Sequence, residues 1–225
     1  MTEQPGTTPK HALVVRGGWD GHVPVPAGDR CAAALKEDGY AVTVSDTLDS
    51  YLDAGLLAGT DLIVQCWTMG SITGEQSAGL AAAVRAGTGL AGWHGGIVDA
   101  FRSDTRYQLM TGGQFVHHPR QFSTYEVRPR PEHAGHPVLA GIEPFTVTTE
   151  QYYLHMDPAV EVLADSVYEP DPDHPELGGT VVPVAWTRRW GAGRVFVIAV
   201  GHNLADLEVP GVDTMLRRGL RWATR

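Results

Sequence analysis

The first half of the chain alternates apolar runs of strand length with amphipathic stretches of helical length. The apolar runs carry few polar residues on either face, which is typical of parallel strands that helices cover on both sides. Gly39 ends the first predicted helix, and Thr73 and Gln76 have the spacing of a capping box at the start of the second. The pattern predicts strands at residues 11–16, 41–45, 61–65 and 88–92, and helices at residues 27–38 and 73–86.

The second half of the chain has a different pattern. Its strand-like segments follow one another with turn residues between them and few helices, so antiparallel pairing is expected. These segments are residues 122–128, 146–153, 160–168 and 181–187, followed by an apolar strand at 194–200 and a closing helix at 212–223. We therefore expect an α/β fold, with a parallel sheet flanked by helices and an antiparallel extension. A single domain is expected at residues 11–225, after a polar, flexible tail at residues 1–10.

The composition of the 225 residues suits a globular protein and restricts its partners. Hydrophobic residues make up 43% of the chain, so a core can form, and the formal net charge of −9 disfavours nucleic acid and anionic membrane surfaces as partners. No apolar run reaches the ~20 residues that span a bilayer, and the first ten residues lack the apolar stretch of a signal peptide. Two cysteines are too few for a disulfide framework, so a reduced, cytoplasmic setting is expected. A homodimer is compatible with these features.

Polar and aromatic residues follow three of the predicted parallel strands, at the sheet edge where open α/β folds bind ligands. The clearest pattern is the segment from Gly92 to Gly96, which has the form G-x-H-x-G with His94 at its centre. Glycines on both sides are typical of a sharp strand-to-helix turn, because side chains there would clash. A histidine packed in a tight loop is the simpler interpretation, but it does not require both glycines. We expect His94 to be exposed at the carboxyl end of a central strand.

Ten histidines are many for a chain of this length, and three of them follow predicted strands. His22 and His94 follow the first and fourth strands, and His202 follows the strand at residues 194–200. Histidines combined with a carboxylate can bind zinc or a similar divalent ion, and they can also move protons near neutral pH. The spacings do not separate these roles. A divalent metal such as zinc, held by these three histidines, is therefore one of two alternatives.

Large aromatic residues lie at or near the same strand ends. Trp19, Trp93 and Tyr152 can stack on a sugar ring through its C–H groups, although core packing is the simpler role for such side chains. His118 precedes Pro119 in a glycine-rich segment and joins these three as a candidate substrate contact. The predicted partner is a small-molecule carbohydrate. The other histidines near prolines are interpreted as solvated loop residues or turn partners of those prolines: His117, His133, His136 and His174.

Several segments together resemble the ThuA-like (trehalose utilisation) family. They read GWHGG at residues 92–96, LMTGGQFVHHP at 109–119, HPVL at 136–139, EQYY at 150–153, PVAWTRRWGAGRVFVIAVGH at 183–202 and LRWA at 220–223. The resemblance implies the flavodoxin-like fold of class I glutamine amidotransferases and a role in the catabolism of trehalose or oxidised 3-keto sugars. It also implies that Glu150 lies near the cleft, and that His202 stands where amidotransferases keep a catalytic histidine.

This chain differs from the amidotransferases at the centre of the turn, where they carry a cysteine and this chain carries His94. A histidine cannot form the thioester that glutamine hydrolysis through cysteine requires. Cys66 follows a different predicted strand and has no flanking glycine pattern. We therefore expect no glutaminase activity.

Two kinds of function are compatible with these residues. The first is an enzyme acting on a glycoside or keto-sugar, in which His94 and His202 exchange protons and Glu150 orients one of them or acts as a base. The second is a non-catalytic carbohydrate-binding or regulatory protein that lost the amidotransferase nucleophile. Convergence of His94, His202 and Glu150 within hydrogen-bond reach would favour the enzyme.

Overall fold

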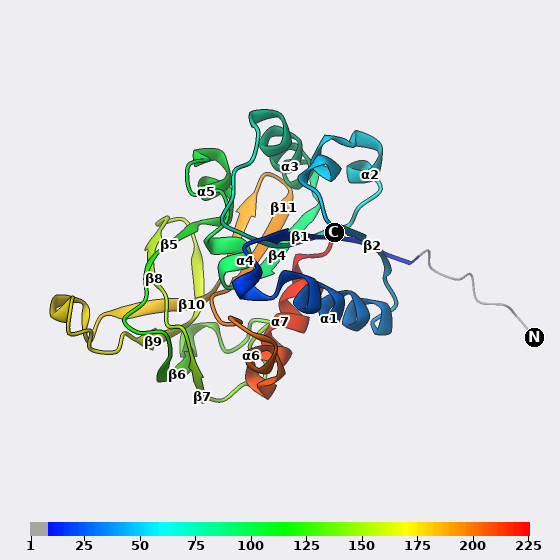
Figure 1. The fold of residues 1–225 in the computed structure, drawn as a ribbon. Helices are drawn as coiled ribbons and strands as arrows, with labels where there is room; N and C mark the ends of the chain where they lie inside the picture. Colours follow the sequence, from blue (N-terminus) through cyan, green and yellow to red (C-terminus); the bar gives the residue numbers. More distant parts are fainter. Residues whose placement is uncertain (1–8) are drawn as a thin grey trace, which may run out of the picture.

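The computed structural model describes residues 9–225 and is shown as a ribbon in Figure 1. The predicted N-terminal tail covers residues 1–10, so residues 1–8 of that prediction lie outside the described part of the chain. The carbonyl group of Lys10 already joins the sheet, because it accepts a hydrogen bond from the N–H of Ala41 at 2.9 Å. No helix in residues 9–225 is both long enough and apolar enough to cross a membrane.

A mixed sheet organises the fold, with its parallel strands together at one side. The strand order is β2-β1-β3-β4-β11-β10-β9-β6-β7 in the described residues. Neighbours from β2 to β11 pair in parallel, and neighbours from β11 to β7 pair antiparallel. The parallel strands are β1 (His11–Gly18), β2 (Ala41–Ser45), β3 (Leu62–Thr68), β4 (Gly89–Trp93) and β11 (Gly193–Ile198). The extension contains β6 (Ser123–Pro129), β7 (Phe145–Thr149), β9 (Glu161–Val167) and β10 (Val181–Trp190).

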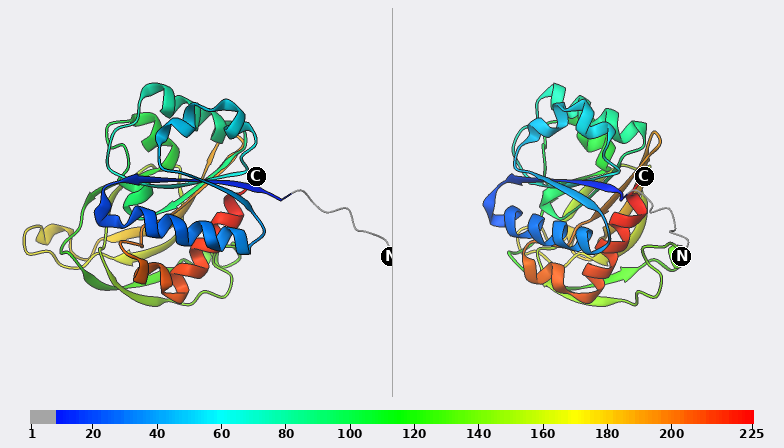
Figure 2. Two further views of the ribbon diagram at one scale, coloured as in Figure 1. Left: turned by 45° about the vertical axis from the view of Figure 1, so that its right-hand side comes forward. Right: turned by 90° about the vertical axis from the view of Figure 1, so that its right-hand side faces the viewer.

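Helices cover both faces of the parallel strands, which appear almost edge-on in the left view of Figure 2. Alternate residues of β1 point to opposite faces, so Val14 packs into one core layer and Leu13 into the other. The first layer contains α1 (Pro24–Glu37), α6 (Leu204–Glu208) and α7 (Pro210–Ala223). The second contains α2 (Ala54–Ala58), α3 (Gly74–Ala86), α4 (Gly95–Val98) and α5 (Thr105–Thr111). The predicted α/β fold with an antiparallel extension is therefore confirmed.

Two of the differences between the predicted and observed elements have a clear physical cause. Helix α1 begins at Pro24 rather than at residue 27, because the first turn of a helix tolerates proline, whose missing N–H needs no partner there. The predicted strand at residues 146–153 is divided between β7 and β8 (Tyr153–Met156), and β8 pairs with β5 (Gly113–His117) in a separate small sheet. The side chain of Gln151 bonds to the backbone of Val167 and Glu169 at 2.8 Å, which holds the chain where it leaves the large sheet.

Candidate active site and metal centre

His94 forms the centre of a sharp turn between β4 and α4, as the glycine spacing predicts. Its backbone has φ 47° and ψ −144°, a conformation that is strained for a residue with a Cβ. A Cβ at Gly92 would lie 2.5 Å from the carbonyl oxygen of Gln65, and a Cβ at Gly96 would lie 3.1 Å from the Cα of Cys66. The close approach of β3 therefore requires glycine on both sides of His94.

Three histidines and one carboxylate converge at this turn. The Oε2 atom of Glu150 lies 3.0 Å from Nε2 of His94, 3.2 Å from Nδ1 of His202 and 3.7 Å from Nε2 of His22. The residues come from four places in the chain, after β1, β4, β7 and β11. The expectation that His94 is exposed is wrong, because its side chain is only 1% exposed in the centre of the cluster. We call His22, His94, Glu150 and His202 the histidine–glutamate cluster.

Hydrogen bonds outside the cluster determine which ring nitrogen faces Glu150. Nδ1 of His94 lies 3.0 Å from the carbonyl oxygen of Ala199, which can only accept, so Nδ1 carries a proton and Nε2 faces the carboxylate. Nδ1 of His22 bonds to the hydroxyl group of Thr68 at 2.9 Å, and its Nε2 also faces Glu150. Metal-binding histidines are oriented in this way by their second ring nitrogen.

Glu150 and His94 direct two acceptor atoms at each other, and this arrangement needs a cation between them. Burial alone would raise the pKa of Glu150, but contacts with His202, His22 and His94 hold it well below its ordinary range, so the carboxylate is ionised at neutral pH. Burial lowers the pKa of His94, and Glu150 compensates only in part. A neutral His94 that donates through Nδ1 directs a lone pair at an anionic oxygen 3.0 Å away. Two acceptors at this distance need a proton or a metal ion between them.

The geometry of the four ligand atoms fits a divalent transition metal. In a tetrahedral zinc site with bonds of about 2.0–2.1 Å, neighbouring ligand atoms lie about 3.3–3.4 Å apart. The three distances from Oε2 of Glu150 bracket this value, and all four ligand atoms lie within 4.8 Å of one another. Nδ1 of His202 is buried 3.2 Å from Oε2 of Glu150 but makes no well-aligned hydrogen bond among residues 9–225, as expected of a nitrogen that binds an ion shared with the carboxylate. Imidazole and carboxylate donors suit zinc and related ions.

His118 and Tyr152 flank the cluster. Nδ1 of His118 lies 2.7 Å from the carbonyl oxygen of Arg120, and its Nε2 faces the second oxygen of Glu150, Oε1, at 3.7 Å. His118 is about one-third exposed, so it is accessible to a ligand. Tyr152 is buried and stacks on His94 with ring centroids 4.0 Å apart, and burial together with the charge of Glu150 raises the pKa of its hydroxyl. Tyr152 therefore packs against the cluster instead of forming the open substrate contact that the sequence suggested.

The tryptophans predicted to contact a substrate lie in different surroundings. Trp19 is 46% exposed and meets the ring of His22 edge-on, with centroids 4.9 Å apart. Trp93 is buried in the core layer of α1 and α7, because its side chain leaves β4 on that face. The expectation that Trp93 contacts substrate is therefore wrong. Phe122, which the sequence analysis missed, is 44% exposed and lies edge-on to His202 at 5.3 Å.

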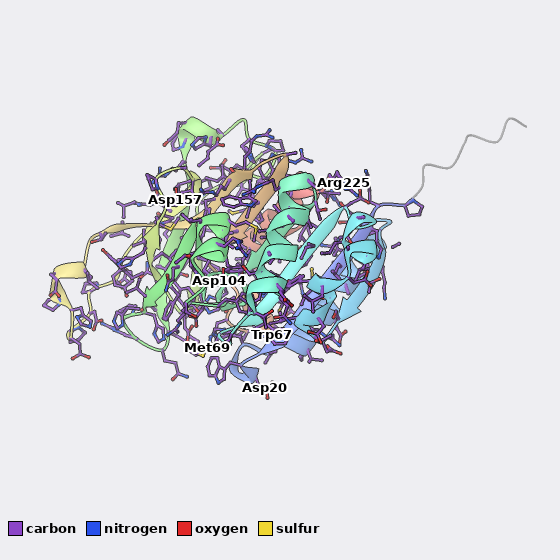
Figure 3. The ribbon with its side chains drawn as sticks, turned by 90° about the horizontal axis from the view of Figure 1, so that it is seen from above. Asp20, Trp67, Met69, Asp104, Asp157 and Arg225 are labelled. Atoms are coloured by element: carbon purple, nitrogen blue, oxygen red, sulfur yellow. The ribbon has the colours of Figure 1, made fainter. Side chains whose placement is uncertain are left out.

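The carboxyl ends of β1 and β3 meet beside the cluster, where Asp20, Trp67 and Met69 lie together at one edge of Figure 3. The N–H of Trp19 donates to the carbonyl oxygen of Thr68 at 3.1 Å, which joins the two strand ends. Thr68 also orients His22 and was missed as a functional residue. Its only signal in the sequence is its position at the end of an apolar strand.

Fold and site together define a class of protein. A largely parallel α/β sheet with a glycine-framed strand-to-helix turn is the fold that the resemblance implied, and here the turn carries His94 of the histidine–glutamate cluster. The sequence profile of the trehalose utilisation (ThuA) family matches residues 11–223. The chain belongs to this family, as the resemblance of its segments indicated.

Solved structures share the fold at low sequence identity. A ThuA-like protein from Parabacteroides merdae has a TM-score of 0.78 and 16% identity, covering 96% of this chain and 90% of the other. A ThuA-like protein from Bacteroides uniformis has a TM-score of 0.73 and 16% identity, covering 99% and 95%. A β-galactosidase from Bacillus circulans sp. alkalophilus has a TM-score of 0.61 and 12% identity, covering 96% of this chain and 30% of the enzyme. No curated protein matches the sequence significantly.

Proposed function

We propose that this protein is a metal-dependent enzyme of carbohydrate metabolism with the histidine–glutamate cluster as its active centre. The observation that carries the proposal is the 3.0 Å separation between the Glu150 carboxylate and Nε2 of the buried His94, whose other nitrogen already donates to Ala199. A cation resolves this conflict between two acceptors. Perturbed, buried titratable groups of this kind gather at functional sites.

The side chains around the cluster have separate roles in this proposal. A divalent ion bound there could expand to five-coordinate, and the fifth ligand would be a sugar oxygen that it polarises or a water whose pKa it lowers. Thr68 and Ala199 hold the imidazoles of His22 and His94 in fixed orientations. His118 accepts or donates a proton at Nε2 beside Oε1 of Glu150, because it is the accessible histidine outside the ligand set.

Two exposed aromatic rings support a carbohydrate as the ligand. Trp19 contacts His22 and Phe122 contacts His202, and both rings are almost half exposed. Full burial of such a side chain is worth about 1.5–3 kcal/mol, so leaving nearly half of it in water forgoes roughly half of that amount. Two such rings beside one polar cluster indicate a surface that a ligand covers. A sugar presents C–H groups to aromatic rings and hydroxyl groups to polar atoms. Together with the family's link to trehalose utilisation, this favours a glycoside or 3-keto sugar as substrate.

The alternative is a non-catalytic carbohydrate-binding or regulatory protein. Such a protein needs the aromatic rings, but it does not need His94 and His202 within about 3 Å of one ionised carboxylate. The separations of 3.0 and 3.2 Å from Glu150 are those of groups that exchange protons or share an ion, and they favour the enzyme.

The experiment is a turnover screen of the zinc-loaded protein with trehalose, glucosides and their 3-keto forms. On the substrate found, we expect His94→Ala and His202→Ala each to lower the rate by at least about 100-fold. His155→Ala is the control, because His155 is exposed on β8 and should keep full activity. Full turnover by both cluster variants, or tight binding of a sugar that is never converted, would contradict the proposal.

A further inference from the structure

A second group of metal-binding side chains lies outside the histidine–glutamate cluster. Nε2 of His117 is 2.6 Å from Oδ2 of Asp171, and the ring of His174 meets the ring of His117 edge-on with centroids 4.8 Å apart. One ligand atom from each residue lies within 4.8 Å of the other two. His117 ends β5, whereas Asp171 and His174 belong to residues 168–180 between β9 and β10, the yellow protrusion at the left of Figure 1. The interpretation of His117 as a solvated loop residue or a turn partner of a proline is wrong, because His117 belongs to β5 and bonds to a buried carboxylate.

A tight turn places Asp171 and His174 side by side. The N–H of His174 donates to the carbonyl oxygen of Asp171 at 3.2 Å, and the N–H of Asp173 donates to Oδ1 of Asp171 at 3.0 Å. The second bond orients the carboxylate so that Oδ2 faces His117. Asp171 is only 2% exposed, and a buried carboxylate needs a cation or several donors. The ring of His117 and the N–H of Asp173 provide two such partners, one at each carboxylate oxygen.

The hydroxyl group of Tyr168 is a buried polar group close enough to Asp171 to be influenced by its charge. Tyr168 is fully buried, and its hydroxyl has no hydrogen-bond partner in the described part of the chain. Burial raises its pKa and the negative charge of Asp171 adds to this effect, so the hydroxyl keeps its proton at neutral pH. An ordered water at the cluster would give this buried hydroxyl a partner.

We propose that His117, Asp171 and His174 bind a second divalent ion such as zinc, which fastens residues 168–180 to the end of β5. Two imidazole nitrogens and one carboxylate oxygen are donors that zinc accepts, and water completes the four ligands. To bind the ion, Nε2 of His117 and Oδ2 of Asp171 would exchange their 2.6 Å hydrogen bond for a separation of about 3.3 Å. The half-exposed His174 leaves the site open to ions from solvent. By fixing His117, the ion also holds the neighbouring His118 beside Glu150. The proposal does not depend on the proposed function, since the two sites share no residue.

Isothermal titration with zinc chloride tests the second site by its stoichiometry. We expect two ions per wild-type chain, and one ion in His117→Ala, in His174→Ala and in Glu150→Gln. The control His155→Ala should bind two. A single wild-type ion that Glu150→Gln removes and His174→Ala keeps would overturn the second site and leave the first in place. A single wild-type ion that His174→Ala removes and Glu150→Gln keeps would support the second site and contradict the first.

Cleavage by a glutamate-specific protease gives an independent measurement, because Glu176 lies in the 168–180 segment and is exposed. Cleavage of a native loop follows the fraction of time for which it is open. We expect zinc to slow cleavage after Glu176 by about tenfold or more in the wild type and in Glu150→Gln, since an ion that binds only the closed loop lowers the open fraction. Zinc should have no such effect in His174→Ala. Equal cleavage rates with and without zinc in the wild type would overturn the proposal.

Discussion

Replacing Glu150 with glutamine distinguishes two accounts of the histidine–glutamate cluster. In one account a metal ion holds the four side chains together, and in the other shared protons do. The substitution keeps the shape of the side chain and exchanges one carboxylate oxygen for an amide that donates two hydrogen bonds. In a metal-free cluster of neutral histidines, the carboxylate faces the lone pair of His94, whose other ring nitrogen donates to Ala199. An amide would donate to this lone pair. We therefore expect the metal-free Glu150→Gln variant to be at least as stable as the wild type at pH 8.

The expected magnitudes follow from the number of bonds gained and from the linkage of binding to folding. One new hydrogen bond contributes about 0.5–1.5 kcal/mol, so the metal-free variant should equal the wild type or exceed it by about 1 kcal/mol. Zinc at 100 to 1,000 times its Kd stabilises a folded protein by about 2.7–4.1 kcal/mol. At about 2–4 °C per kcal/mol for a chain of this size, the Tm of the parent chain that keeps Glu150 should rise by about 5–16 °C. The variant has lost an anionic ligand and should gain less than about 4 °C.

The assay is thermal unfolding at pH 8, with a chelator and with saturating zinc. All chains carry His174→Ala, so that the second proposed ion does not contribute. Glu126→Gln is the matched control, because Glu126 is exposed on β6 and takes part in no ion pair among residues 9–225. It should respond to zinc as the parent chain does.

The opposite result would refute the reasoning. If Glu150 instead neutralised a protonated histidine, removing its charge would leave a buried cation unpaired at a cost of about 3–5 kcal/mol. The metal-free variant would then melt about 6–20 °C below its parent, and zinc would change neither Tm.

Acidification below about 6.5 should destabilise the metal-free protein, because burial lowers the pKa of His94 in the folded chain and the unfolded chain therefore takes up the proton first. The Tm should fall more steeply between pH 8 and pH 5 in the wild type than in His94→Ala, and equal slopes would contradict this. Gly95→Ala should abolish zinc binding at the histidine–glutamate cluster or lower the Tm, because its Cβ would lie 2.3 Å from the ring of His22, whereas Gly74→Ala places its Cβ in open space. If Gly95→Ala bound zinc and melted as Gly74→Ala does, the crowding argument would fail. The protein should release no ammonia from glutamine, because the turn carries no thiol; ammonia release that is lost in Cys66→Ser would show otherwise.

The parallel half of the fold could be predicted because its strands are apolar on both faces and its helices carry local start and stop signals. The turn at His94 could be predicted as well, since the glycines at 92 and 96 reflect contacts with the neighbouring strand. The burial of the His94 side chain could not be predicted, because Tyr152 covers it from a distant segment of the chain.

The position of Glu150 depends on contacts that no local pattern contains. An alternating run at residues 146–153 suits one continuous strand, but Gln151 bonds to Val167 and Glu169 and divides it. That division places Glu150 just after β7, against three histidines from other strand ends. Phe122 lies at the rim for a similar reason, since only the folded chain brings it to His202.

X-ray absorption at the zinc edge tests the metal centre most directly, using the His174→Ala chain loaded with one equivalent of zinc. The account predicts three imidazole nitrogens and one carboxylate oxygen at about 2.0–2.2 Å, and loss of this spectrum in Glu150→Gln or His94→Ala. An ion surrounded by water oxygens alone, or a spectrum that neither substitution changes, would contradict the central claim that His22, His94, Glu150 and His202 bind a metal ion.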